Sequence, residues 1–369
     1  MKTPQQRLTI DDIARLAGVS SATVSRVLSG SQVVSPATRR RVEAVVSRFG
    51  YQPNRLARNL RNGHSDVIGV IVSDIENPHF ATMVRAMEDA VYQRGKRLVL
   101  CNTSEDAAKQ ASYLGVMAVE RVLGVLLSPS DPDDPEVGRL IDLGIPIVAF
   151  DRAVADPRAD SVTAGNWSAA QVATEVLFDG GHRRIGFVAG RSGVQTGDDR
   201  LAGYLEAIAT VGLVPAVAWG DFSLEGGRAA TEALLATVPR PTALVIGNNQ
   251  MTLGAMELLR RSGLRVPEDM AIVAFDDPPW ASLVDPPLTV LSQQLRPMAR
   301  AAVELLFQRI ADPLPPPTHL RFDFELRVRR SSGPASPREQ PVGEGAGFRP
   351  EREGVAPAPP GAPPVPPTR

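Results

Sequence analysis

Seven short, almost continuous apolar runs follow one another through the middle of the chain, and they constrain the fold more than any other feature. In order they read VIGVIVS, RLVLCN, VLGVLLS, PIVAF, RIGFVA, TALVIG and MAIVAF. Stretches with helical spacing lie between them, such as residues 80–95 and 251–263. Buried strands that alternate with helices are typical of parallel sheets covered on both faces. Because seven strands are spread over about 230 residues, we expect two doubly wound α/β lobes.

The first 61 residues carry a large excess of positive charge. They contain eleven lysines and arginines and only three acidic residues, a net charge of +8, which leaves −9 for the rest of the chain. A compact basic module on an acidic body is typical of a protein that binds a polyanion. Charge alone leaves both nucleic acid and an anionic membrane surface as partners.

The residue pattern inside this basic module predicts three short helices. Thr9 is a candidate N-cap for the first helix, which Gly18 ends, and Ser20 is a candidate cap for the second. Ser35 begins a third helix that stops before Gly50. Two short helices joined by a tight turn form a helix-turn-helix, whose second helix enters the major groove of DNA. Because the arginines are spread over all three helices, a membrane-surface helix is disfavoured.

The sequence lacks the patterns of a catalytic or cofactor site. No GxGxxG follows an expected strand, no lysine ends a glycine-rich loop, no GxSxG motif occurs, and the four histidines are far apart. Asp276 and Asp277 are adjacent, so their side chains diverge, which argues against an acid–base pair. With Cys101 as the only cysteine, we expect no disulfide, metal, cofactor or enzymatic activity. No signal peptide or membrane span is evident, so we expect a cytoplasmic protein.

Two consecutive segments, LTIDDIARLAGVSSATVSRVLSG and VSPATRRRVEAVVSRFGYQPNRLARNLR, resemble the DNA-binding head of the LacI/GalR family of bacterial repressors. The resemblance continues to about residue 330, nearly nine-tenths of the chain. It implies an all-α helix-turn-helix head followed by a periplasmic-binding-protein-like α/β core of two doubly wound parallel-sheet subdomains. The expected divisions are a helix-turn-helix domain at 1–53, a hinge helix and linker at 54–65, a first subdomain at 66–165 completed by 293–330, and a second at 166–292.

The resemblance also implies which residues contact DNA. In the family, the segment matching PNRLARNL is a hinge helix that folds on operator DNA and inserts a leucine between base steps, by position Leu60. Ser21 and Ala22 lie where the family selects sequence, and Arg26 is expected at a base edge. The expected DNA-binding residues are Thr9, Ser20, Ser21, Ala22, Thr23, Ser25, Arg26, Asn54, Arg55, Arg58 and Leu60. A linker with incidental helicity is the alternative reading of the hinge segment.

Polar and aromatic residues follow several of the expected strands. Ligands of open parallel sheets bind beyond the carboxyl ends of the strands, and a mixture of donors, acceptors and rings suits a sugar or polyol. The expected effector-binding residues match those of ribose-type members of the family and are Asn77, Phe80, Asp151, Arg152, Arg200, Phe222, Asn248, Asp276 and Gln293. His79 replaces a usual aromatic ring and Asn249 a usual acid, so a small sugar or polyol is expected rather than ribose itself.

After residue 330 the composition changes to proline, glycine and charge, which predicts a disordered tail at 331–369. It has no leucine heptads of the kind that form a tetramerising helix, so we expect a homodimer on a pseudo-palindromic operator. The expected function is an effector-controlled transcriptional regulator, as a repressor. The alternatives are a family member that has lost ligand sensing and one that answers to a non-sugar effector such as a nucleoside. An effector that weakens operator binding and one that strengthens it would use the same domains, so both remain open here.

Overall fold

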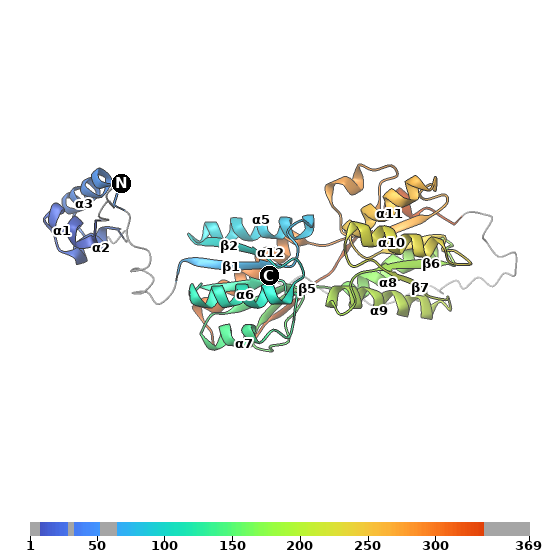
Figure 1. Ribbon diagram of the computed structural model, residues 1–369, viewed down its shortest axis with the longest axis horizontal. Coiled ribbons are helices and arrows are strands. Elements are labelled where there is room, and N and C mark those ends of the chain that lie inside the picture. Colours follow the sequence, from blue (N-terminus) through green and yellow to red (C-terminus); the bar gives the residue numbers. More distant parts are fainter. Residues whose placement is uncertain (1–7, 29–32, 52–64, 336–369) are drawn as a thin grey trace, which may run out of the picture.

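The computed structural model describes residues 8–28, 33–51 and 65–335, which form a small helical head and two larger α/β lobes (Figure 1). The head contains α1 (Ile10–Ala17), α2 (Ser21–Leu28) and α3 (Pro36–Phe49). Ile13, Val24 and Val42, one from each helix, are fully buried in its core. The three helices predicted from the sequence are therefore present.

The caps of the head helices are formed by the residues that the sequence indicates. The Thr9 hydroxyl accepts a hydrogen bond from the backbone N–H of Asp12, whose carboxylate in turn accepts from the backbone N–H of Thr9. Ser35 caps α3 in the same way, through the N–H three residues later. Gly18 and Gly50 end α1 and α3 with φ of 62° and 58°, a left-handed conformation that favours glycine.

The first lobe is built on a six-stranded parallel sheet in the order β11-β5-β4-β3-β1-β2. Its strands are β1 (Val67–Val72), β2 (Arg97–Asn102), β3 (Gly124–Leu127), β4 (Ile147–Asp151), β5 (Asp160–Ala164) and β11 (His319–Phe322). Helices cover both faces, namely α5 (Pro78–Gln93) and α12 (Leu295–Ala311) on one and α6 (Ala107–Val119) and α7 (Pro135–Asp142) on the other (Figure 1).

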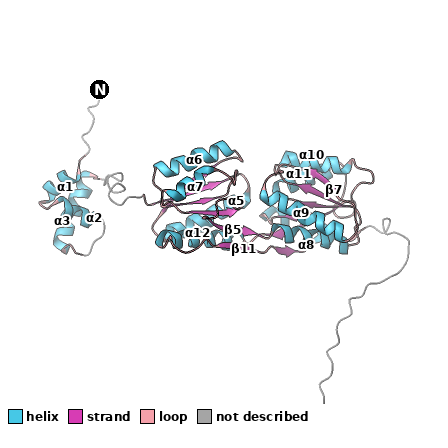
Figure 2. Ribbon diagram, turned by 90° about the horizontal axis from the view of Figure 1, so that it is seen from below, coloured by secondary structure: helices cyan, strands magenta, loops and turns pink. Residues whose placement is uncertain are grey.

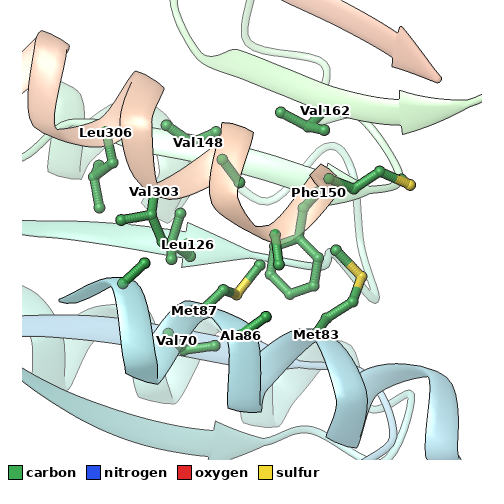
Figure 3. Close-up of a cluster of buried hydrophobic side chains, with 14 of the residues drawn as sticks. Val70, Met83, Ala86, Met87, Leu126, Val148, Phe150, Val162, Val303 and Leu306 are labelled. Carbon is green, nitrogen blue, oxygen red and sulfur yellow. The ribbon is translucent and has the colours of Figure 1, made fainter. Parts of the chain in front are cut away.

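Alternation along the buried strands supplies two separate cores in this lobe. Leu126 of β3 and Val148 of β4 pack under α5 and α12, together with Met83 and Val303 from those helices (Figure 3). Their sequence neighbours, such as Val125, face the opposite core under α6 and α7. The central strands β1, β3 and β4 are thus buried on both faces, which explains why they read as continuous apolar runs.

The second lobe has the same layered plan, with six strands in the order β12-β10-β9-β8-β6-β7. The strands are β6 (Ile185–Ala189), β7 (Ala216–Trp219), β8 (Ala243–Ile246), β9 (Ala271–Phe275), β10 (Thr289–Ser292) and β12 (Glu325–Arg327), of which β12 alone among them is antiparallel to its neighbour. Its helices are α8 (Asn166–Asp179) and α9 (Gln195–Thr210) on one face and α10 (Leu224–Leu235) and α11 (Asn249–Arg261) on the other. Two 3-10 turns, Pro279–Ser282 and Arg330–Ser332, complete it. A helical head is followed in the chain by two lobes, each with a largely parallel sheet between two layers of helices. This arrangement confirms the expected fold class.

Within residues 65–335 the chain passes between the lobes three times. It leaves the first lobe between β5 and α8, returns between β10 and α12, and leaves again between β11 and β12 (Figure 2). The expectation that 293–330 completes the first subdomain is therefore wrong for its last residues, because β12 pairs with β10 of the second sheet.

The beginning of the expected tail also differs from the sequence interpretation. The Ser331 hydroxyl is buried and donates to the carbonyl oxygen of Ile272 at 2.7 Å, and Ala335 is 6% exposed. These contacts attach residues 331–335 to the second lobe, so a tail beginning at 331 is wrong for these five residues; residues 336–369 lie outside the described part of the chain. None of the described helices combines the length and apolar character needed to span a bilayer.

Candidate effector cavity and DNA-binding head

A cavity of about 290 Å³ lies between the two lobes, at the carboxyl ends of strands from both sheets. All nine residues that the sequence singles out for effector binding line it: Asn77, Phe80, Asp151, Arg152, Arg200, Phe222, Asn248, Asp276 and Gln293. The parallel direction of the strands brings these residues together although they are spread over more than 200 positions of the chain. Their role in binding remains a prediction.

Three of these residues have a backbone conformation that is uncommon outside glycine. Asp151 at the end of β4, Asp276 just after β9 and Phe222 before α10 have φ of 66°, 71° and 71°. Such conformations cluster at functional sites because the surrounding structure must hold them. The Phe222 ring also needs Gly190 beneath it, since a Cβ there would lie 2.1 Å from Cε1 of the ring.

His79 lies between carboxylates from the two lobes. Its Nε2 is 3.1 Å from Oδ1 of Asp151, and its Nδ1 is 4.0 Å from Oδ1 of Asp276. Burial by itself lowers the pKa of His79, but the hydrogen bond and charge of Asp151 and the charge of Asp276 raise it above the ordinary value, against a smaller effect of Arg200. Burial acts to raise the pKa of Asp151, yet the hydrogen bond and charge of His79 bring it below the ordinary value. Position 79, where an aromatic ring is usual, is thus occupied by a histidine that forms a buried ion pair with Asp151.

Arg200 is held rigidly on the second-lobe side of the cavity. Its Nε donates to Oδ1 of Asn166 at 2.8 Å, its Nη1 donates to the carbonyl oxygen of Gly247, and its guanidinium lies 4.3 Å from the centre of the Phe275 ring. Burial lowers the pKa of Arg200, which is 4% exposed. Because these contacts fix its orientation in advance, Arg200 can donate to a ligand with little loss of side-chain freedom.

Arg152 forms an ion pair with an acidic residue that the sequence analysis did not predict. Its guanidinium forms two hydrogen bonds to the carboxylate of Glu105, at 2.6 and 2.8 Å, and a third to the carbonyl oxygen of Pro129 at 3.2 Å. Glu105 follows β2 by three residues, so the rule that ligand sites lie beyond strand ends would have found it. The other lining residues not expected are Asp74, Glu76, His79, Asn102, Ser104, Thr196, Asp221 and Ser223, although His79 was noted as a departure from the family pattern.

Hydrogen bonds across the cleft connect the lobes directly. Asn249 Nδ2 donates to Oδ1 of Asn77 at 2.9 Å, so the residue that replaces a usual acid here joins the two lobes. At another point the backbone N–H of Ala153 donates to Oε1 of Gln195 at 2.8 Å. The cavity is thus formed by lobes that already touch.

In the head, Ala22 and Arg26 are exposed on α2, and their contacts with DNA stay a prediction. Several other candidate DNA-contacting hydroxyls have local partners. The Ser20 and Thr23 hydroxyls are 2.9 Å apart and Ser21 donates to Asp11. These hydroxyls would exchange a partner on binding DNA. Asn54, Arg55, Arg58 and Leu60 lie outside the described residues.

Nothing in the described part of the chain is arranged as a metal centre. Across residues 8–28, 33–51 and 65–335, no three histidine, cysteine, aspartate or glutamate side chains form a group that could hold a metal ion. The polar groups of the cavity instead offer hydrogen-bond donors and acceptors beside two rings, which suits non-covalent binding of a small polar molecule.

Two family models match the chain. Residues 9–54 match the bacterial regulatory proteins of the lacI family, and residues 174–332 match a periplasmic binding protein-like domain. The HTH-type transcriptional repressor PurR of Photobacterium profundum is 34% identical over 331 residues, 88% of this chain and 98% of that protein. The HTH-type transcriptional regulator CelR of Thermobifida fusca is 36% identical over 337 residues, 89% of this chain and 99% of that protein.

Solved structures agree with these matches. A transcriptional regulator CelR–cellobiose complex is 35% identical, with 88% of this chain and 100% of that chain covered and a TM-score of 0.67. The Lac repressor dimer bound to operator and the anti-inducer ONPF is 28% identical, with 89% and 100% covered and a TM-score of 0.80. These relatives are named as regulators and not as enzymes, in agreement with the expected absence of catalysis. With a helix-turn-helix head, two binding-protein-like lobes and relatives that match along their whole length, this chain belongs to the LacI family of bacterial regulatory proteins.

Proposed function

We propose that this protein is a dimeric, operator-binding transcriptional repressor whose DNA affinity is controlled by a small sugar-like or polyol effector bound between the two lobes. The observation that carries the proposal is the convergence of nine polar and aromatic side chains from both lobes on one cavity of about 290 Å³. Membership in a family whose relatives are named transcriptional repressors supports the DNA-binding part.

The chemistry of the cavity favours a ligand rich in hydroxyl groups. Asp151 and Asp276 supply acceptors, Arg200 supplies donors, and Asn248 can supply both. Phe80 and Phe222 provide apolar ring surface of the kind that packs on sugar C–H groups. A 35% identical regulator has been solved with cellobiose, which supports a sugar as the class of effector.

For the operator, we assign the base-reading role to α2, with Ser21, Ala22 and Arg26 as its main contacts. Residues 54–65 are assigned to a hinge helix and linker, with Leu60 as an apolar wedge in the minor groove. The solved complex of the Lac repressor dimer with operator supports this arrangement by homology. Dimerisation sets two heads at the spacing of a pseudo-palindromic site.

The edge of the first sheet supports a dimer. Strand β2 is the last strand of its sheet, and its Val99 and Leu100 are 45% and 39% exposed. On helix α6, which follows β2 in the chain, Val116 and Val119 are 50% and 80% exposed. An exposed edge strand with apolar side chains is a site for association with another chain, and a second copy would cover it.

Control follows from linkage between the two lobes and the paired heads. An effector that binds one lobe arrangement more tightly than another shifts the population toward that arrangement, by no more than its differential affinity. The lobe arrangement in turn sets the separation of the two hinge segments at the dimer axis. Whether the effector releases or recruits the operator depends on which arrangement it prefers.

The test is a thermal-shift screen of the full chain against pentoses, hexoses, polyols and nucleosides, followed by operator titration with and without each hit. A ligand at about 100 times its Kd stabilises the folded state by about 2.7 kcal/mol, which is readily detected. Asp276→Ala is expected to abolish the shift, whereas Asp179→Ala, an exposed acid at the end of α8, leaves it unchanged. A shift with nucleosides alone would contradict the sugar class, and a hit that leaves operator binding unchanged would contradict control by the effector.

A further inference from the structure

A separate cavity of about 820 Å³ lies in the first lobe, at the edge of its sheet opposite to the cavity between the lobes. It is lined by residues at the starts of the parallel strands β3 and β4 and just before β5 and β11, and by the carboxyl-terminal ends of α6, α7 and α12. This end of the first lobe lies away from the second lobe (Figure 1). The second cavity therefore belongs to one lobe and lies outside the cleft.

The wall of this cavity is made of branched aliphatic and proline side chains. Val122, Ile145 and Ile147 are buried in it, whereas Leu143 and Leu314 are 58% and 90% exposed at its opening. Exposed apolar side chains gathered around a hollow mark a binding site. None of the described residues that line the cavity is aromatic or acidic. The wall thus suits an aliphatic ligand, because a flat aromatic ligand would find no ring to stack on.

The loop at residues 312–317 forms one side of the cavity and is fixed in place. The guanidinium of Arg309 donates to the carbonyl oxygens of three prolines in this loop, and it forms an ion pair with the buried Asp160 at 2.8 Å. Four of the six loop residues are prolines, which restrict the backbone further. Small-molecule sites are usually preformed and measure about 300–1,000 Å³. The cavity has both properties.

The charged residues that line the cavity are three arginines, of which one has no partner. Arg158 forms an ion pair with Asp142 at 2.7 Å, and Arg309 is paired with Asp160. The guanidinium of Arg121 has no hydrogen-bond or ion-pair partner among the described residues. The uncompensated charge at the cavity is therefore a single positive one, which a ligand carboxylate could pair with through charge-assisted hydrogen bonds.

We propose that this cavity is a second ligand site and that it binds an aliphatic carboxylic acid. The apolar chain of the acid packs against Leu143, Ile310 and Leu314, and its carboxylate pairs with Arg121. The backbone carbonyl oxygen of Arg121 accepts from the N–H of Ser65 at 2.9 Å, so the ligand lies beside the point where the chain enters the first lobe. The site is independent of the class of effector proposed for the cleft.

The test measures binding of octanoate, decanoate and 1-octanol to the full chain by isothermal titration calorimetry, below the concentrations at which these probes form micelles. We expect one decanoate per chain. Decanoate should bind about tenfold more tightly than octanoate, because two further methylene groups leave water. 1-Octanol has the same chain length as octanoate without its charge, so it separates the apolar contact from the ion pair.

Two variants test the charge and the apolar wall separately. Arg121→Gln should weaken octanoate and decanoate at least about threefold and change the Kd of 1-octanol less than about twofold, since only the acids lose a charged partner. Arg300→Gln, an exposed arginine of α12 outside the cavity, is the matched control. Leu314→Glu places a carboxylate at the opening, on a side chain exposed enough to leave folding intact, and should weaken decanoate at least about fivefold. Val214→Glu, at a position 83% exposed in the second lobe, is its control and should leave the Kd unchanged.

Three results would overturn the second site. One is the absence of binding by all three probes to a chain that unfolds cooperatively, and another is a Kd for decanoate that Arg121→Gln and Leu314→Glu change no more than their controls do. The third is loss of decanoate binding in Asp276→Ala, which would place the acid in the cleft. The first two results leave the proposed control by an effector in the cleft unaffected.

Discussion

The amide of Asn249, at the start of α11 in the second lobe, donates a 2.9 Å hydrogen bond to the Asn77 side chain, which caps α5 in the first lobe. The same Asn77 oxygen accepts from the N–H of His79. One carbonyl oxygen therefore both starts a helix of the first lobe and holds the second lobe against it. The hydrogen bond between Asn249 and Asn77 therefore depends on how the two lobes are arranged.

Removing this contact should weaken effector binding. A neutral hydrogen bond contributes about 1 kcal/mol, so Asn249→Ala should raise the effector Kd about fivefold by making the lobe arrangement that contains the bond less populated. Asn249→Asp should raise the Kd further, because a carboxylate has no N–H to donate and its negative charge would face the Asn77 oxygen. Calorimetric Kd values measure both, and an unchanged Kd in the two variants would contradict a role for this bond in effector affinity.

The ion pair of His79 with Asp151 predicts how stability depends on pH. Because the pKa of His79 is raised in the folded protein, its contribution to the free energy of unfolding is complete below the pKa of the unfolded chain, near 6.5. That contribution is lost as the pH rises through the pKa of the folded protein. For Asp151 the pKa is lowered, so its contribution is present above its unfolded value and is lost only at lower pH. Arg200 and Asp276 are the other charged groups that act on the imidazole.

The measurement is the fall in Tm between about pH 6 and about pH 8.5. His79→Gln, which can still donate to Asp151 but does not titrate, should show a smaller fall than the wild-type chain. His319→Gln is the control, since His319 is an exposed histidine at the edge of the first sheet. The same fall in all three proteins would show that the pair with Asp151 does not link stability to pH.

The exposed edge of the first sheet predicts the effect of a charge placed there. Val99→Lys on β2 should shift the protein from dimer to monomer, because an unpaired ammonium group would have to be buried between two copies. Sedimentation velocity at several concentrations measures the change. Val214→Lys, at a position that is 83% exposed in the second lobe, should leave the dimer intact, and a Val99→Lys protein that stays dimeric would place the dimer contact elsewhere.

Leu60 provides a test of the hinge assignment, which rests on the sequence. Leu60→Ala should weaken specific operator binding by at least about tenfold, because the apolar wedge that holds the duplex bent is lost. Effector affinity, set by the distant cavity, should change little. Fluorescence anisotropy with operator DNA and calorimetry with effector measure the two affinities, and a parallel loss of both would be evidence against a hinge role.

Strands that form continuous apolar runs could be predicted, and short or polar strands could not. All seven apolar runs form strands, β1 to β4 together with β6, β8 and β9. The strand β5 was missed because its sequence, DSVTA, is polar. Its buried Asp160 is neutralised by an ion pair with Arg309, at 2.8 Å, which lies 149 positions away. Strands β7, β10 and β12 were missed too: β7 and β12 are half-exposed strands at the two edges of the second sheet, and two of the four residues of β10 are polar.

The candidate site was predictable in its membership and not in its pairing. Strand ends and the family resemblance together predicted nine of the eighteen residues that line the cavity, and all nine predicted residues are among them. Neither source indicates that Glu105 engages Arg152, or that His79 lies between Asp151 and Asp276, because such pairs join segments whose separation in space depends on the packed fold. Similarly, residues 331–335 read as tail but are fixed by the Ser331 hydroxyl and the burial of Ala335.

The three passages of the chain between the lobes impose an order on synthesis. The second lobe's strands β6 to β10 are all made before α12 and β11, which the first lobe needs to cover one face and one edge of its sheet. The first lobe therefore stays incomplete until nearly all of the second lobe has emerged from the ribosome. During that time β5 is unpaired on one side and the apolar face that α12 covers is exposed. The lobe that carries the head and its DNA contacts is begun first and completed late.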